Sequence, residues 1–119
     1  MYVARIFKTK GFARSARKAG IRDSELCEAI AEVMKGQADD LGGGVMKKRL
    51  NRNEHRSIIL MKGERNWFYQ YLFAKKDRAN IDDDELAAFK ELAKAYDKLD
   101  HEALTRLIAS KELVEICDD

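Results

Sequence analysis

The sequence predicts an α+β domain, and three features of the chain support this prediction. Two segments with apolar residues at helical spacing precede a run of strand-like segments, and two further helical segments follow that run. The strand-like segments are joined by short connections, so neighbouring strands are expected to pair antiparallel. A chain of 119 residues, 45% hydrophobic and 37% charged, is large enough to bury the core of one soluble globular domain.

The N-terminal part is predicted to be a strand followed by a helical hairpin. Tyr2–Phe7 is rich in β-branched and aromatic residues, as strands are. A basic helix is expected over Thr9–Ala19, with Gly20 placed to end it. A second, acidic helix is expected to be capped by Asp23 or Ser24 and to run to about residue 35. Its apolar face consists of Leu26, Ile30, Val33 and Met34.

The middle of the chain is predicted to form a sheet. Asp39–Gly44 is expected to be a turn or loop, because three consecutive glycines do not hold a regular element cheaply. Three strands should follow, at Val45–Leu50, Arg56–Met61 and Trp67–Ala74. The last of these is almost wholly apolar, which indicates a central strand that is packed on both faces.

Helices are expected to dominate the C-terminal part. Asp82 offers an N-cap to a long helix with an acidic first turn, and Asp100 offers one to a shorter helix. Glu112–Ile116 alternates like a short edge strand. We therefore expect one domain over residues 1–119, with a core at about 1–81, a sheet of about four antiparallel strands and a helical extension at 82–119.

Targeting and redox features predict a cytoplasmic protein. The N-terminus is too short and too charged for a signal peptide, and no stretch approaches the ~20 apolar residues of a membrane span, so we expect no membrane partner. Cys27 and Cys117 are expected to be two unpaired thiols in a reducing cytoplasm, and there is no second pair of cysteines to make a metal site. No His, Asp and Glu ligand set is visible, so no metal or other cofactor is expected.

The charge is strongly segregated although the net charge is only +2. Residues 45–78 hold ten Lys or Arg against three Asp or Glu, and residues 1–20 hold six basic groups and no acidic one. Residues 21–44 hold two basic groups against six acidic ones, and residues 79–119 hold five against twelve. Basic groups on and beside apolar strands predict a surface that binds a polyanion.

Strand alternation selects the basic residues that act together. Lys47 and Arg49 should point the same way, about 7 Å apart, which matches successive phosphates on one nucleic-acid strand. Arg56 can reach the same face across the hairpin, while Lys48 should point to the other face. Lys76 comes just beyond the last strand.

A cluster of this kind could cleave RNA through its own 2′-hydroxyl. Crowded cations can stabilise the charged phosphorane, and a lysine whose pKa is depressed by cationic neighbours could move a proton. His55 would be the conventional base if it faces the cluster; otherwise it is a solvated turn residue.

Three segments resemble the RelE/HigB superfamily of bacterial type II toxins: Gly42–Leu50, Arg56 at the next strand, and Phe73–Ile81. The resemblance spans about residues 1–99, and Lys75–Ile81 is its most specific part. It implies a RelE-like fold and a metal-independent mRNA interferase. Such a toxin would bind in the ribosomal A site, in contact with 16S rRNA, and cut the codon there. It also implies a cognate antitoxin, with operator DNA bound only through that antitoxin.

The resemblance also implies roles for individual residues. Lys47 and Arg49 would contact mRNA and assist proton transfer, Arg56 would stabilise the scissile phosphate, and Lys76 would act near the leaving group. Further RNA contacts are expected from Lys48, Arg52, His55, Lys75 and Arg78, and contacts with ribosomal RNA from Lys10, Arg14, Arg17 and Lys18. Some members carry a catalytic tyrosine where this chain has Asp82, which is expected to be a helix cap, so the general base stays open.

Two other functions remain open at this point. A ParE-type toxin on the same scaffold would inhibit DNA gyrase without cutting RNA, although the basic set argues against it. A protein retained mainly as an antitoxin-bound autorepressor is the second. The acidic C-terminal helices are expected to be a packing layer rather than a guard over the basic surface.

Overall fold

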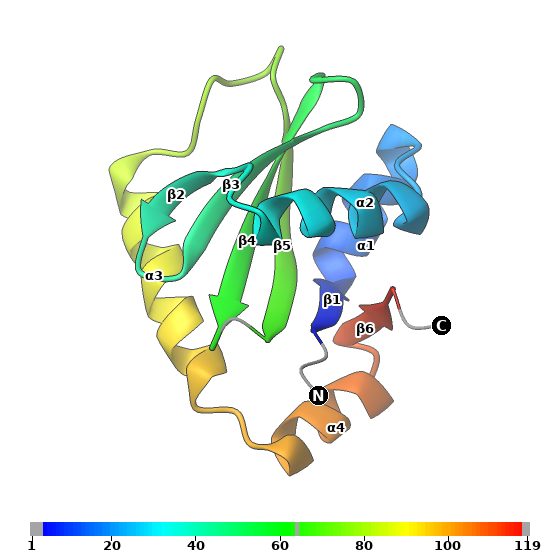
Figure 1. Cartoon of the computed structure of the whole chain (residues 1–119), viewed down its shortest axis with the longest axis vertical. Helices are drawn as coiled ribbons and strands as arrows, with labels where there is room; N and C mark the ends of the chain where they lie inside the picture. Colours follow the sequence, from blue (N-terminus) through cyan, green and yellow to red (C-terminus); the bar gives the residue numbers. More distant parts are fainter. Residues whose placement is uncertain (1–3, 64, 118–119) are drawn as a thin grey trace.

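The computed structural model describes residues 4–63 and 65–117 and confirms the α+β class (Figure 1). Six strands form one sheet in the order β2-β3-β4-β5-β1-β6. The elements are β1 Arg5–Thr9, α1 Lys10–Ala19, α2 Asp23–Met34, β2 Asp39–Gly42, β3 Val45–Leu50, β4 His55–Lys62, β5 Asn66–Ala74, α3 Asp83–Asp97, α4 His101–Ala109 and β6 Leu113–Ile116.

The sheet has more strands than the sequence predicts. Asp39–Gly42, expected to be a loop, pairs antiparallel with β3 as strand β2. The triple glycine still makes the turn between them, since Gly42, Gly43 and Gly44 have φ of 88°, 61° and 84°, a region that glycine enters without penalty. β2 lies at the exposed edge, so its sequence carries no apolar alternation from which a strand could be predicted.

β5 is the central strand that its apolar sequence predicts. It pairs antiparallel with β4 on one side and parallel with β1 on the other. The parallel pair was not expected. It requires a long connection between the two strands, and α1, α2 and β2 to β4 all lie between β1 and β5 in the chain. β6 is the expected edge strand, antiparallel to β1. Tyr2 and Val3 of the predicted first strand lie outside the described residues, and β1 runs on to Thr9.

The sheet separates two cores. α1 and α2 cover one face, where Phe12, Leu26 and Tyr69 are fully buried, and the Tyr69 hydroxyl donates to the Leu26 carbonyl at 2.6 Å. α3 and α4 pack on the other face, around Phe68 (Figure 1). Since both faces of β5 are covered, the positions of its side chains are fixed by packing.

Local capping explains where the helices begin and end. Thr9 caps α1 by accepting from the Phe12 backbone N–H, and Gly20 ends it at φ 73°. Asp82 and Asp100 cap α3 and α4, as expected. The expectation that Asp23 or Ser24 caps α2 was wrong: α2 begins at Asp23, Arg22 is its N-cap residue, and no side chain makes the capping bond. Met34 of its predicted apolar face is exposed.

The expectation of two free thiols was wrong. Cys27 on α2 and Cys117, just after β6, form a disulfide with their Cα atoms 5.5 Å apart. The two residues are 90 positions apart in the chain. They lie close together because β6 pairs with β1 and Ile116 packs in the same core as α2.

Candidate nucleic-acid interface

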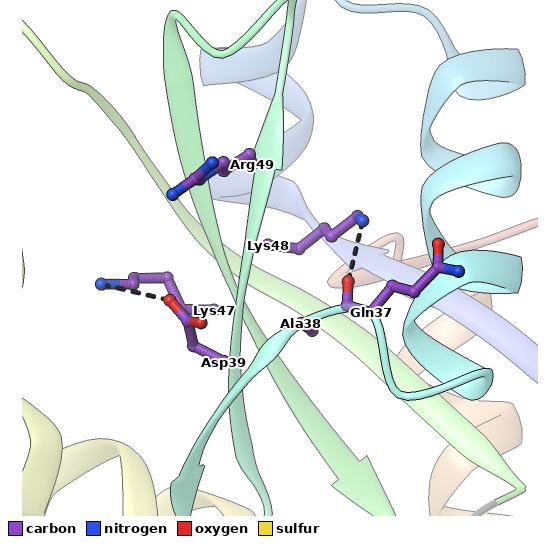
Figure 2. A pocket seen from close by; sticks show the side chains of 6 residues that line it. All are labelled: Gln37, Ala38, Asp39, Lys47, Lys48 and Arg49. Carbon is purple, nitrogen blue, oxygen red and sulfur yellow. Dashed lines mark hydrogen bonds and ion pairs between the residues drawn. The ribbon is translucent and has the colours of Figure 1, made fainter.

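The three consecutive basic residues of β3 point to two sides of the sheet, as alternation predicts. Figure 2 shows Lys47 and Arg49 on one side of the strand and Lys48 on the other. Lys48 Nζ donates to the Gln37 carbonyl at 2.8 Å and lies 3.0 Å from a carboxylate oxygen of Glu32 on α2. Lys48 therefore ties β3 to α2, while Lys47 and Arg49 share the face that carries Arg56.

The basic end of β3 borders a hollow of about 250 Å³. β2 pairs with β3 only as far as Lys47, so no described strand pairs with the edge that follows. Lys47 Nζ lies 3.7 Å from Asp39, its cross-strand partner, and Arg49 is exposed. The lining residues, drawn in Figure 2, are Gln37, Ala38, Asp39, Lys47, Lys48 and Arg49.

Arg56 stands directly opposite Arg49 in the register of β3 and β4. Its other cross-strand partner is Phe73 on β5. The Arg56 Nη1 donates to the carbonyls of Asn53 and His55, at 2.9 Å and 3.1 Å, so the guanidinium is held against the turn. Like charges placed opposite each other destabilise a sheet, and an anion bound between them removes that cost.

Arg78 extends this face beyond β5. Its guanidinium lies over the ring of Phe73, 5.7 Å from the centroid, and its Nη1 is 3.5 Å from the Tyr71 hydroxyl. Both Nη atoms also bond the carboxylate of Glu85 in the first turn of α3, one of them at 3.0 Å. Arg78 holds the pKa of Glu85 down at about 2, and Glu85 raises the pKa of Arg78.

The contact between Arg78 and Glu85 is an ion pair between the basic face and α3. Among the predicted site residues, Arg78 is the one paired with an α3 carboxylate in the described part of the chain. α3 is fixed instead through apolar side chains such as Phe89 and Tyr96. That the C-terminal helices act as a packing layer stays a prediction.

The Arg78–Glu85 pair gives a pH-dependent prediction. Because Arg78 lowers the pKa of Glu85 from 4.5 to about 2, the pair stabilises the folded state fully above about pH 4.5 and progressively less as the pH falls toward 2. We expect Glu85→Gln to lower the melting temperature at pH 6 and to have a smaller effect near pH 2.5. Thermal unfolding followed by circular dichroism at both pH values measures this; an equal effect at both would contradict it.

Lys76 lies apart from Lys47 and Arg49, in a second hollow of about 400 Å³. β1 pairs with β5 only as far as Tyr69, so the C-terminal half of β5 has an edge that faces α1 across this hollow. The lining residues are Ser15, Lys18, Ala19, His55, Tyr71, Leu72, Phe73, Ala74, Lys76, Asp77 and Arg78. The expected catalytic residues are thus divided between the sheet face and the end of β5.

His55 does not share the face of Arg56. The two residues are consecutive in β4, and His55 pairs with Leu50 and Ala74 rather than with Arg49 and Phe73. The hollow at the end of β5 nevertheless includes both His55 and Tyr71. Tyr71 is not among the predicted site residues, because within an apolar run it resembles a core position.

The remaining predicted contacts are on the surface. Arg52 is exposed at the tip of the β3–β4 turn, and Lys75 is exposed where its backbone N–H donates to the Glu54 carbonyl at 2.9 Å. Lys10, Arg14, Arg17 and Lys18 are all exposed on α1, whose other side buries Phe12 and Ala16. Asp82 is engaged as the N-cap of α3, with its carboxylate accepting from the Glu85 N–H at 2.8 Å.

Within residues 4–63 and 65–117, no three His, Cys, Asp or Glu side chains are grouped so that they could hold a metal ion. None of the helices described above is both long and apolar enough to cross a membrane.

Comparison with known proteins identifies the family. A family model described as the RelE toxin of the RelE/RelB toxin-antitoxin system matches residues 4–116. No curated protein sequence matches the chain significantly. The family match covers every strand and helix described above. The chain therefore belongs to the RelE toxin family: it is a toxin of a toxin-antitoxin system, and its partner is an antitoxin.

Proposed function

We propose that this toxin is a metal-independent endoribonuclease that cuts messenger RNA on the ribosome and so inhibits translation in the cytoplasm. The observation that carries the proposal is the facing pair of Arg49 and Arg56, with Lys47 on the same face. Side chains directly opposite in an antiparallel pair have Cβ atoms only about 5 Å apart, so two guanidinium groups there form a concentrated positive field. A phosphodiester is the ligand that this field suits.

The chemistry requires positive charge where the phosphorane develops negative charge. Donors fixed before the reaction stabilise such a transition state without reorganisation, and Arg56 is held in place by two backbone carbonyls. We assign Arg56 to the scissile phosphate and Lys47 and Arg49 to the adjoining RNA backbone. Lys76, in the hollow at the end of β5, is assigned to the leaving 5′-oxygen.

Ribosome dependence is supported by the charge on α1. Its four basic residues are exposed, Lys18 among them lines the hollow that contains Lys76, and together they offer a surface for ribosomal RNA. In this proposal, which places the chain in the HigB-like part of its superfamily, the toxin enters the A site against 16S rRNA. Operator DNA is bound only through the antitoxin.

Mapping of RNA ends in cells tests the proposal. The toxin is expressed from an inducible promoter, and 5′ ends are mapped on a reporter message and on the same message without its start codon. We expect new ends in codon phase on the translated message alone. Growth arrest with intact messages and a DNA-damage response would instead indicate gyrase inhibition, and absence of any growth effect would indicate a regulatory role.

A further inference from the structure

The C-terminal end of β5 has a short free edge that borders a hollow. β1 pairs with β5 only as far as Tyr69, and no described strand pairs with the part of this edge that follows. The hollow beside the edge measures about 400 Å³ and is bordered by α1, the end of β5 and the loop after β5. Pockets for small ligands measure roughly 300 to 1,000 Å³, so the hollow is large enough for one.

Leu72 and Ala74 direct their backbone polar groups toward this free edge. The Lys75 N–H donates to the Glu54 carbonyl at 2.9 Å, which continues the antiparallel ladder between β5 and β4 by one residue. The backbone groups of successive residues in a strand point alternately to its two sides, so those of Ala74 and Leu72 point away from β4. The Leu72 carbonyl and the Ala74 N–H therefore have no partner strand among the described residues.

The free edge is too short to pair with an added strand. At one end the Gln70 carbonyl accepts from the Thr9 hydroxyl at 3.5 Å, and at the other end the Ala74 carbonyl accepts from the Asp77 N–H at 3.0 Å. The Leu72 carbonyl and the Ala74 N–H lie between these two bonds. One acceptor next to one donor suits a single planar group that carries a donor beside an acceptor, rather than an extended peptide of several residues.

The walls of the hollow suit an aromatic ring that is attached to a phosphate. Lys18, Lys76 and Arg78 line the hollow with positive charge, against one carboxylate from Asp77. The half-buried Tyr71 belongs to the same lining, and its hydroxyl lies 3.5 Å from the Arg78 guanidinium. Proteins recognise unpaired nucleobases by stacking them on aromatic rings or guanidinium planes and by hydrogen bonds to their polar edges. A nucleobase edge also carries donors and acceptors side by side.

We propose that this hollow binds a nucleobase of the substrate RNA, with the Leu72 carbonyl and the Ala74 N–H forming hydrogen bonds to the polar edge of the base. Because Lys76 is assigned to the leaving 5′-oxygen, the base belongs to the nucleotide that follows the cut, a placement that rests on the proposed ribonuclease function. The four bases carry their donors and acceptors at different positions, so the two backbone groups favour one base over another. The hollow therefore selects the base after the cut.

Titration with nucleotides tests the site without any cleavage. The full chain, with its amide nitrogens isotopically labelled, is titrated with each of the four ribonucleoside monophosphates and followed by nuclear magnetic resonance. Ribose phosphate serves as the matching ligand without a base. We expect the amide resonance of Ala74 to shift with at least one nucleotide and to stay in place with ribose phosphate. An equal shift with ribose phosphate, or no shift with any nucleotide, would overturn the inference.

Ser15→Trp tests whether the hollow itself holds the base. Ser15 is exposed on α1 and lines the hollow, so an indole at this position fills the space without disturbing the core. We expect nucleotide affinity to fall by about tenfold or more. The matched control is Ser110→Trp, which makes the same change at the exposed end of α4, away from the hollow, and should bind like the wild type. Equal affinities of the two variants would contradict the placement of the base.

Single-turnover cleavage on ribosomes tests the selection of the base. For messages that differ only in the nucleotide after the cut, we expect the wild type to favour one base by about fivefold or more and Ser15→Trp to discriminate by less than about twofold. Loss of antitoxin binding by Ser15→Trp with base preference intact would assign the edge to a peptide and overturn the inference. A wild type that binds nucleotides but cuts no message would contradict the proposed function alone, whereas equal cutting of all the messages would overturn the selection proposed here.

Discussion

Arg56→Ala is expected to reduce message cleavage by about 100- to 1,000-fold, the range found when one fixed transition-state donor is removed. The reason is that Arg56 stands directly opposite Arg49, with its guanidinium held by the carbonyls of Asn53 and His55. The measurement is the single-turnover rate on translating ribosomes. Arg56→Lys should recover only part of the rate, because an ammonium lacks the planar fork of donors.

A second readout separates this effect from damage to the fold. Removing Arg56 relieves its repulsion with Arg49, so the free energy of unfolding should stay unchanged or rise by up to about 1 kcal/mol. Arg106→Ala is the matched control, because Arg106 is exposed on α4 and pairs only with Glu102 among the described residues. Cleavage by Arg56→Ala at the rate of Arg106→Ala would contradict the assignment.

Reduction of the Cys27–Cys117 disulfide is expected to lower the free energy of unfolding by about 4 to 5 kcal/mol. The bond joins residues 90 positions apart, and a link across so long a loop removes much of the conformational freedom of the unfolded chain. Urea unfolding with and without a dithiol reductant measures the difference. The double variant Cys27→Ser, Cys117→Ser should match the reduced wild type and should not respond to the reductant.

The folded sheet should survive that reduction. β6 remains paired with β1, and Arg5 donates two hydrogen bonds of 2.8 Å to the Glu115 carboxylate, whose pKa it lowers. The secondary structure seen by circular dichroism in the absence of urea should therefore be the same in both redox states. Identical urea midpoints with and without reductant would show that the bond does not contribute to stability.

The parts of the fold that could be predicted are those set by interactions between residues close together in the sequence. Thr9 and Gly20 bound α1 through bonds within a few residues, and Asp82 starts α3 through a reciprocal bond with Glu85, so short motifs were sufficient. The apolar run of β5 likewise identified a central strand. β2 could not be predicted, because it is a strand only by virtue of pairing with β3.

In the candidate site too, features set within one strand could be predicted and features set by contacts between strands could not. Alternation in β3 correctly separated Lys47 and Arg49 from Lys48, since the period of two is a property of any strand. It could not reveal that Arg56 faces Arg49 directly, because cross-strand register depends on the left-handed turn at Asn51–Asn53. It also could not reveal that Lys76 joins His55 rather than Lys47.

The sequence by itself determined the class of fold, the end of α1, the starts of α3 and α4, the central strand and the set of cations on one face, because each follows from spacing and capping over a few residues. Only the tertiary structure decided the edge strand β2, the pairing of Cys27 with Cys117 and the division of the basic residues between two hollows. These features join segments that lie far apart in the chain or depend on strand register. Such contacts form only when the two cores on either side of β5 have packed, so they cannot be predicted from short sequence patterns.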